Sequence, residues 1–170
     1  VSAKGNYPDC DMLPIGRLSK NGTCHGPQNR MSQFTKAEQY TLMSLWGIFK
    51  SPLMIGGNLP DNDDFTLSLL TNSEYMEMHA KSYGARQIAR EEKNGKGKIV
   101  WAANGKGCKY IALFNTGDKE KVLKVDLSTV LMPDTDYKVL DIWQNEQLGS
   151  FKNTISLSVA PHGARLLKLS

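Results

Sequence analysis

The feature that most constrains the fold of this chain is a change in hydrophobic period near residue 82. Before it, continuously apolar runs such as residues 53–57 alternate with helical patterns. After it, apolar and polar residues alternate one by one. Continuously apolar strands between helices are typical of parallel βα units, whereas a period of two between turns is typical of antiparallel sheets. The sequence therefore predicts an α/β segment followed by an all-β segment.

A helix is the most strongly marked element of the first segment. Thr35 and Glu38 have the S/T-x-x-E spacing of a capping box, which satisfies backbone N–H groups at a helix start. Pro52 ends this helix, because the residue before a proline avoids the α conformation. The apolar stripe of the helix consists of Tyr40, Leu42, Met43, Leu45, Trp46 and Phe49. Two buried strands and two further helices are predicted at residues 11–15, 53–57, 63–70 and 73–81.

The first segment is expected to depend on other protein for its stability. Two βα units cannot close a barrel, and their strand edges and apolar faces need neighbours. An exposed patch of its apolar side chains would be larger than monomers tolerate. We therefore expect residues 1–81 to pack on the second segment, to self-associate with another copy, or to be protease-sensitive. Val1 is not a start methionine and no signal-peptide pattern follows it, so the natural N-terminus is expected elsewhere.

Residues 82–170 predict an antiparallel β-sandwich with its own core. Short alternating runs are separated by turn signals such as Asn94-Gly95 and Asn104-Gly105. The candidate strands are residues 86–91, 99–103, 109–115, 119–126, 136–143, 146–151, 154–159 and 164–169. A length of about ninety residues is enough for one closed core, so we expect this segment to fold autonomously.

Charge and cysteine content exclude several classes of function. The net charge of +4 divides into −2 for residues 1–80 and +6 for residues 81–170. The lysines of the second half alternate as on a solvated strand face, which predicts no nucleic-acid partner. No apolar run approaches the roughly eighteen residues of a membrane span. Cys10, Cys24 and Cys108 have no metal-ligand spacing, so no metal is expected. A Cys10–Cys24 disulfide is conceivable, and the spacing leaves it open.

One pair of carboxylates stands where chemistry could occur. Asp9 and Asp11 are two residues apart at a predicted strand, so their side chains would face the same side. If that strand belongs to a barrel, its carboxyl end lines the active site. A loop or capping pair is the alternative that the spacing alone favours.

Four segments together carry a resemblance to a known family. Residues 7–13 (YPDCDML) resemble a W-x-D-P-D-M-L motif, and residues 45–56 (LWGIFKSPLMIG) are similar to an L-W-A-x-x-x-x-P-L-x-x-G motif. Residues 69–72 (LLTN) resemble the segment that follows. Asp141-Ile-Trp143, Gly149 and residues 159–167 (VAPHGARLL) resemble a D-L-W…G…V-x-P-H-G-x-x-L-L pattern. All four motifs belong, in this order, to the α-galactosidase and α-N-acetylgalactosaminidase family of glycoside hydrolases.

The resemblance implies a division of the chain and a set of binding residues. Residues 1–81 would be the C-terminal part of a (β/α)₈ catalytic barrel, its last two βα units, and residues 82–170 a C-terminal antiparallel β-sandwich. Asp11 and Met12 match positions that line the galactose pocket of the family, and Asp9 matches the first carboxylate of the motif. The chain departs from the motif at Tyr7, where the family has tryptophan, and at Cys10, where it has proline.

The resemblance also implies that this chain has no catalytic residue. Retaining enzymes need two carboxylates about 5 Å apart. The family places the nucleophile in a Y-x-K-x-D segment and the acid/base in an R-x-x-x-D segment, both upstream of the match at residues 9–13. Asp126 ends a segment similar to the nucleophile motif, but it lies in a period-two strand and predicts a turn or surface carboxylate. His162 predicts a turn-stabilising residue.

The implied parent enzyme is a retaining α-galactosidase that releases terminal α-galactosyl residues from carbohydrates without a metal or organic cofactor. Its sugar could equally be N-acetylgalactosamine or arabinopyranose, and the family suggests a secreted or periplasmic location. The alternative function is a non-catalytic sandwich that binds carbohydrate or only supports other protein. Trp101 and Trp143 have core-facing patterns, which argues against an aromatic sugar platform. Asn21-Gly-Thr23 fits a glycosylation sequon.

Overall fold

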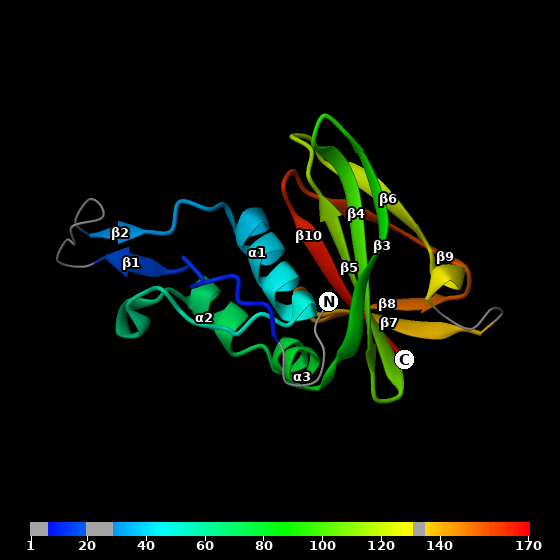
Figure 1. The fold of residues 1–170 in the computed structure, drawn as a ribbon, viewed down its shortest axis with the longest axis horizontal. Coiled ribbons are helices and arrows are strands. Elements are labelled where there is room, and N and C mark those ends of the chain that lie inside the picture. Colours follow the sequence, from blue (N-terminus) through cyan, green and yellow to red (C-terminus); the bar gives the residue numbers. More distant parts are fainter. Residues whose placement is uncertain (1–6, 20–28, 131–134) are drawn as a thin grey trace.

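The computed structural model describes residues 7–19, 29–130 and 135–170. A helical segment lies beside a structure of antiparallel strands (Figure 1). The helical segment comprises β1 (Arg17–Ser19), β2 (Arg30–Met31), α1 (Lys36–Phe49), the 3-10 turn η1 (Leu59–Asp61), α2 (Asp64–Leu70) and α3 (Ser73–Lys81). No helix among the described residues is long and apolar enough to cross a membrane.

All eight strands expected after residue 82 are present. They are β3 (Tyr83–Lys93), β4 (Lys96–Gly105), β5 (Cys108–Asn115), β6 (Lys121–Asp126), β7 (Tyr137–Asp141), β8 (Glu146–Phe151), β9 (Thr154–Val159) and β10 (Ala164–Leu169), with the 3-10 turn η2 (Leu127–Thr129) after β6. Six of them form one antiparallel sheet in the order β3-β4-β5-β10-β7-β8, and β6 pairs with β9 in a second sheet. The period-two prediction of antiparallel sheets is thereby confirmed.

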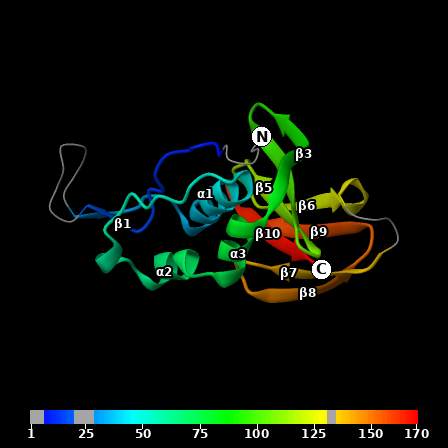
Figure 2. The ribbon, with the colours of Figure 1, turned by 60° about the horizontal axis from the view of Figure 1, so that its bottom comes forward.

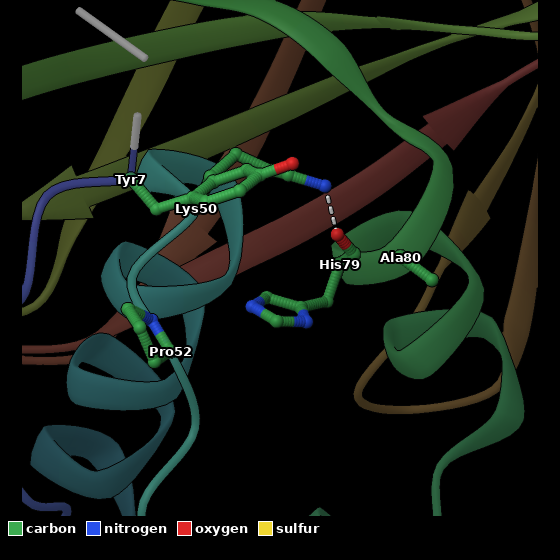
Figure 3. Close-up of a pocket in the computed structure, with 5 residues that line it drawn as sticks. All are labelled: Tyr7, Lys50, Pro52, His79 and Ala80. Atoms are coloured by element: carbon green, nitrogen blue, oxygen red, sulfur yellow. Dashed lines mark hydrogen bonds between the residues drawn. The ribbon is translucent and has the colours of Figure 1, made fainter. Parts of the chain in front are cut away.

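Helix α1 begins at the capping box that the sequence predicts. The Thr35 hydroxyl accepts a hydrogen bond from the Glu38 N–H at 3.2 Å, and the Glu38 carboxylate accepts one from the Thr35 N–H at 2.8 Å. The helix ends at Lys50, which adopts a left-handed conformation with φ 70°. The Lys50 ammonium then donates to the carbonyl of His79 near the end of α3 (Figure 3). Lys50 therefore joins the ends of α1 and α3.

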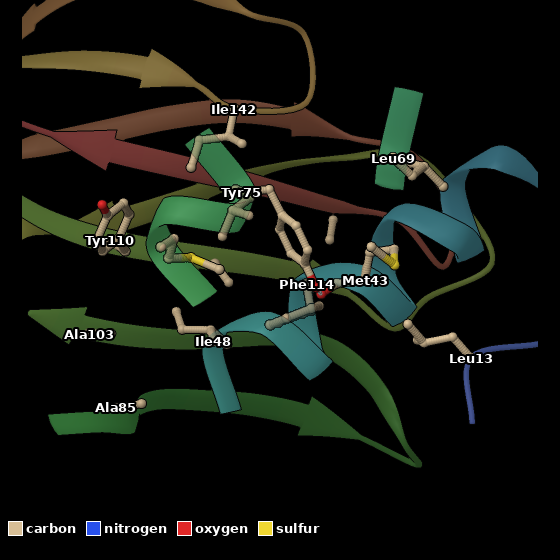
Figure 4. Packing of buried hydrophobic residues seen from close by; sticks show 14 of the residues in the cluster. Leu13, Met43, Ile48, Leu69, Tyr75, Ala85, Ala103, Tyr110, Phe114 and Ile142 are labelled. Carbon is tan, nitrogen blue, oxygen red and sulfur yellow. Dashed lines mark hydrogen bonds between the residues drawn. The ribbon is translucent and has the colours of Figure 1, made fainter. Parts of the chain in front are cut away.

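The centre of the six-stranded sheet is buried on both faces, whereas its edge strands β3 and β8 are largely exposed. Strand β5 is buried at every position from Tyr110 to Asn115. Because successive side chains of a strand point to opposite faces, both faces of β5 must be covered. Ile111 and Leu113 face the β6–β9 sheet, in a cluster with Leu123, Val125, Ile155 and Val159. Tyr110, Ala112 and Phe114 belong to a second cluster, which includes Met43 and Ile48 of α1 and Tyr75 of α3 (Figure 4). The helices therefore share a core with the sheet.

Helix α1 packs against β10 and β5, as a second view also indicates (Figure 2). The rings of Phe49 and Trp101 meet edge to face with centroids 5.5 Å apart. Trp143 lies between Tyr40 and Tyr75, and its indole N–H donates to the Ser44 hydroxyl at 2.8 Å. Both tryptophans thus face the helices, in agreement with their core-facing pattern. Of the alternatives expected for residues 1–81, packing on the second segment is the one this structure contains.

The strands predicted at residues 11–15 and 53–57 are where the structure differs from expectation. They are reduced to one parallel bridge between Leu13 and Ile55, with hydrogen bonds from the Leu13 N–H to the Met54 carbonyl and from the Gly56 N–H to the Leu13 carbonyl. Two short parallel strands without flanking strands have too few ladder bonds to remain regular. The short β1–β2 hairpin is an element that the sequence did not predict.

We predict that limited proteolysis will cleave first within residues 1–81 and leave a resistant core of residues 82–170, because the second segment contains a complete inter-sheet cluster. Met43→Ala should hasten this cleavage. Met43 is fully buried between α1 and the sheet, and its truncation should lower the free energy of unfolding by about 2–5 kcal/mol.

The matched control is Met54→Ala, because Met54 is 40% exposed and its truncation should change the free energy of unfolding by less than about 0.5 kcal/mol. Mass spectrometry of the fragments and urea unfolding followed by circular dichroism measure both effects. A uniformly resistant monomer would show that the boundary near residue 82 is wrong. Equal effects of the two methionine variants would show that Met43 is not part of the core between α1 and the sheet.

Candidate functional site

The segment from Asp9 to Leu13 is held on its backbone by the elements around it. The Cys10 N–H donates to the Ser51 hydroxyl at 2.9 Å, just after the end of α1. The indole N–H of Trp46 on α1 donates to the Asp11 carbonyl at 3.1 Å. Leu13 is bonded on both sides to residues 54–56. Local sequence alone does not determine the path of this segment, since its partners lie about forty residues further along.

The two carboxylates of the segment do not lie on a strand, which corrects the strand prediction. Asp9 accepts a hydrogen bond from the Asp11 N–H at 2.8 Å, and Asp11 accepts one from the Met12 N–H at 2.7 Å. Asp11 has a left-handed backbone with φ 69°. In this structure each carboxylate therefore caps a backbone N–H, as the loop alternative predicted.

Asp9, Asp11 and Met12 are all exposed, and Met12 has 56% of its surface accessible. The structure therefore brings the three residues together on one short segment with their side chains open to a ligand. Residues 15–17 also pass very close to Gly57. A Cβ on Gly57 would lie 2.9 Å from the carbonyl oxygens of Ile15 and Arg17. Only glycine permits this approach, which fixes residues 13–17 against residues 55–57.

A cavity of about 240 Å³ lies beside this segment, between the end of α1 and the end of α3. It is lined by Tyr7, Lys50, Pro52, His79 and Ala80 (Figure 3). Burial lowers the pKa of Lys50. Burial also lowers the pKa of His79, although its ring nitrogen Nε2 lies 2.8 Å from the Ser51 carbonyl oxygen. The cavity therefore favours neutral imidazole.

The other singled-out residues have structural roles. Asp126 caps η2 by accepting from the Ser128 N–H at 2.9 Å, as expected for a turn carboxylate. His162 adopts φ 52° in its turn, and its carbonyl accepts from the Thr41 hydroxyl of α1 at 2.6 Å. The turn that contains His162 therefore also fastens α1 to the sandwich.

Asp141 is a buried carboxylate that the sequence marks only as the first residue of the Asp141-Ile-Trp143 motif. It accepts from the N–H groups of Trp143 and Gln144 at 3.0 Å, and its Oδ2 lies 2.6 Å from the Arg165 Nε. Burial raises the pKa of Asp141, against the opposing effect of these partners. Asp141 thus fixes the turn that carries Trp143.

In the described part of the chain, no group of three or more acidic, histidine or cysteine side chains could hold a metal ion. Cys10 and Cys108 are free thiols. Cys24 and the sequon at residues 21–23 lie outside the described residues.

Comparisons with known proteins identify the relatives of this chain. Residues 95–169 match the family described as the alpha galactosidase C-terminal beta sandwich domain. Alpha-galactosidase D of Emericella nidulans is 28% identical over 98% of this chain and 23% of its own length, and alpha-galactosidase 2 of Arabidopsis thaliana is 27% identical over 98% and 38%. The crystal structure of a GH27 β-L-arabinopyranosidase from Geobacillus stearothermophilus is 43% identical, covers 98% of this chain and 37% of its own, and superposes with a TM-score of 0.88.

The likenesses to the relatives include both the helical segment and the sandwich, and the family model that matches residues 95–169 describes a C-terminal domain. Residues 95–169 belong to the family of this C-terminal sandwich domain, and the likenesses together support the C-terminal part of the α-galactosidase family for the chain as a whole. It spans 23% and 38% of the length of the two curated relatives named above.

The buried histidine predicts a pH dependence of stability. Because burial lowers the pKa of His79, the unfolded chain binds a proton near the ordinary pKa of about 6.5, at which the folded chain does not. Stability should therefore decrease as the pH falls from 7 through about 6.5 towards 5.5. Urea unfolding at these pH values should give a weaker decrease for His79→Gln than for the unchanged chain. Identical pH slopes would contradict this role of His79.

Proposed function

We propose that this chain is the C-terminal portion of a retaining glycoside hydrolase that releases terminal α-galactosyl residues from carbohydrates. In this proposal residues 1–81 supply the last two βα units of a (β/α)₈ catalytic barrel, and residues 82–170 form the sandwich that supports it. The observation that carries the proposal is the match of residues 95–169 to the alpha galactosidase C-terminal sandwich domain, together with the likeness over 98% of this chain to an alpha-galactosidase of which it covers only 23%. The parallel bridge between Leu13 and Ile55 is the pairing that neighbouring barrel strands make.

The proposed substrate-binding residues are Asp9, Asp11 and Met12. A sugar offers hydroxyl groups as donors and acceptors, and an exposed carboxylate is a strong acceptor for them. The side chain of Met12 supplies an apolar surface for the ring. The short Asp9–Leu13 segment fits a binding role because its backbone is held from two sides while these three side chains stay exposed.

No residue of this chain is proposed as nucleophile or acid/base. Neither Asp9 nor Asp11 matches a position where the family places a catalyst, Asp126 caps a turn, and Asp141 is paired with Arg165. Retaining hydrolysis needs a nucleophile and a proton donor on opposite sides of the scissile bond. In our proposal both belong to a part of the enzyme that is not in this chain.

A β-L-arabinopyranoside is the second candidate substrate, because a 43% identical structure is that of a β-L-arabinopyranosidase. A non-catalytic carbohydrate-binding sandwich is the third candidate. It is less well supported, since Trp101 and Trp143 pack against helix side chains and are not available as an exposed platform. Binding of a sugar by residues 82–170 alone would favour the third candidate.

The isolated chain should show no hydrolysis of an aryl α-galactoside or an aryl β-L-arabinopyranoside above background. The reason is the lack of both catalytic carboxylates, whose roles are nucleophilic attack and proton donation. Release of the chromophore measures this. Turnover that disappears in Asp9→Asn or Asp11→Asn would refute the prediction and would make that pair catalytic.

In the longer enzyme, Asp11→Ala should lower kcat/KM for its glycoside by about ten- to a hundredfold, because a hydrogen bond from a charged group is worth roughly 1.5–3 kcal/mol. The melting temperature should fall only modestly, because the Asp11 side chain is exposed and alanine in its left-handed conformation costs about 1–2 kcal/mol. Measuring both aryl glycosides in parallel also identifies the preferred sugar. Unchanged kinetics on the preferred substrate would reject the binding role of Asp11.

A further inference from the structure

The Trp46 side chain connects the sandwich-facing helix with the proposed sugar-binding segment. Its indole N–H donates to the Asp11 carbonyl at 3.1 Å, across 35 positions of the sequence. Asp11 has a left-handed backbone, which residues other than glycine seldom adopt, although Asp and Asn do so more often than the rest. An unusual conformation persists only where surrounding contacts determine it. Trp46 supplies such a contact from outside the segment.

The contacts on the two sides of Asp11 differ in origin. Its N–H is held by the neighbouring Asp9 carboxylate at 2.8 Å, and its own carboxylate accepts from the Met12 N–H at 2.7 Å. These bonds are local and turn with the segment. The bond from Trp46, by contrast, attaches the peptide between Asp11 and Met12 to helix α1. The orientation of both exposed side chains depends on this peptide.

Helix α1 is itself fixed to the sandwich near Trp46. The indole N–H of Trp143 donates to the Ser44 hydroxyl at 2.8 Å, and the Thr41 hydroxyl donates to the His162 carbonyl at 2.6 Å. Ile48 is fully buried in the cluster shared with the sheet. The position of Trp46 is therefore set by the sandwich, and the position of the Asp11 carbonyl is set by Trp46.

We propose that Trp46 is a positioning residue, whose indole N–H fixes the Asp11 peptide and thereby orients the Asp11 carboxylate and the Met12 side chain towards the sugar. This inference rests on the proposed function, because it assumes that Asp11 contacts substrate. The sandwich then contributes to substrate binding through α1 without touching the sugar.

The test uses the longer enzyme and the variants Trp46→Phe, Asp11→Ala and the double variant. Trp46→Phe keeps an aromatic ring and removes the N–H, so kcat/KM should fall by about three- to tenfold, mainly through a higher KM. If Trp46 acts through Asp11, adding Trp46→Phe to Asp11→Ala should change kcat/KM by less than about twofold. Replacement of Trp46 by benzothienylalanine keeps the shape of the indole and removes only the N–H. It should therefore reproduce the loss of kcat/KM, which separates the lost hydrogen bond from any disturbance of packing by Phe.

The matched control is Trp143→Phe, which removes another indole hydrogen bond to the same helix but none to the segment. It should lower the melting temperature and raise KM less than Trp46→Phe does, because the Thr41 hydroxyl and Ile48 still fix α1 to the sandwich. In the chain itself, hydrogen exchange measured by mass spectrometry should accelerate more at residues 9–13 in Trp46→Phe than in Trp143→Phe.

The outcomes separate this inference from the proposed function. If Asp11→Ala impairs activity but Trp46→Phe leaves KM unchanged, the positioning role is wrong and the binding role stands. The positioning role is also overturned if the two losses multiply fully in the double variant. If Asp11→Ala has no effect, both the binding role of Asp11 and the inference fail.

Discussion

A sheet that carries apolar side chains on both faces must be covered twice, and the rest of this structure depends on that constraint. On β5, Ile111 and Leu113 face one layer, and Tyr110, Ala112 and Phe114 face the other. Burial of each large apolar side chain stabilises the fold by about 1.5–3 kcal/mol, so exposure of either face lowers the free energy of unfolding. The β6–β9 sheet covers one face, and α1 with α3 covers the other.

The packing of α1 and α3 on the sheet determines the geometry of the candidate site. Gly47 of α1 allows close approach of α3, since a Cβ there would lie 2.5 Å from the Tyr75 ring. The Tyr75 hydroxyl donates to the Met43 carbonyl at 2.9 Å, and Asn72 donates to the Ile142 carbonyl, also at 2.9 Å. Helix α1 is thus located by the sheet, by α3 and by the turn after β7. The residues that hold the Asp9–Leu13 segment, Trp46 and Ser51, lie on α1 and directly after it.

Much of this architecture can be predicted from the sequence because its causes are local. The capping box at Thr35 and Glu38 gives the start of α1, and the period of two with Gly-containing turns gives the strands from β3 to β10. The family motifs at residues 7–13 and 45–56 point to Asp11 and Met12 by resemblance. These signals depend on neighbours within a few residues, so no tertiary information is needed to read them.

The rest depends on contacts between distant parts of the chain. The sequence marks Trp46 as one residue of an apolar stripe and of the motif at residues 45–56, and nothing nearby shows that its N–H reaches Asp11. The strand pattern at residues 11–15 likewise gives no sign that Asp11 takes a left-handed conformation, since the apolar residues around it suggest regular pairing. The unequal division of the strands into sheets of six and two follows from chain connections over long separations.

The most direct test of this account is a crystal structure of the longer enzyme with galactose bound. We expect the Asp11 carboxylate within about 3 Å of a sugar hydroxyl, the Met12 side chain against the ring and the Trp46 N–H still on the Asp11 carbonyl. A sugar bound away from the Asp9–Leu13 segment, with Asp11 turned from the ligand, would contradict it.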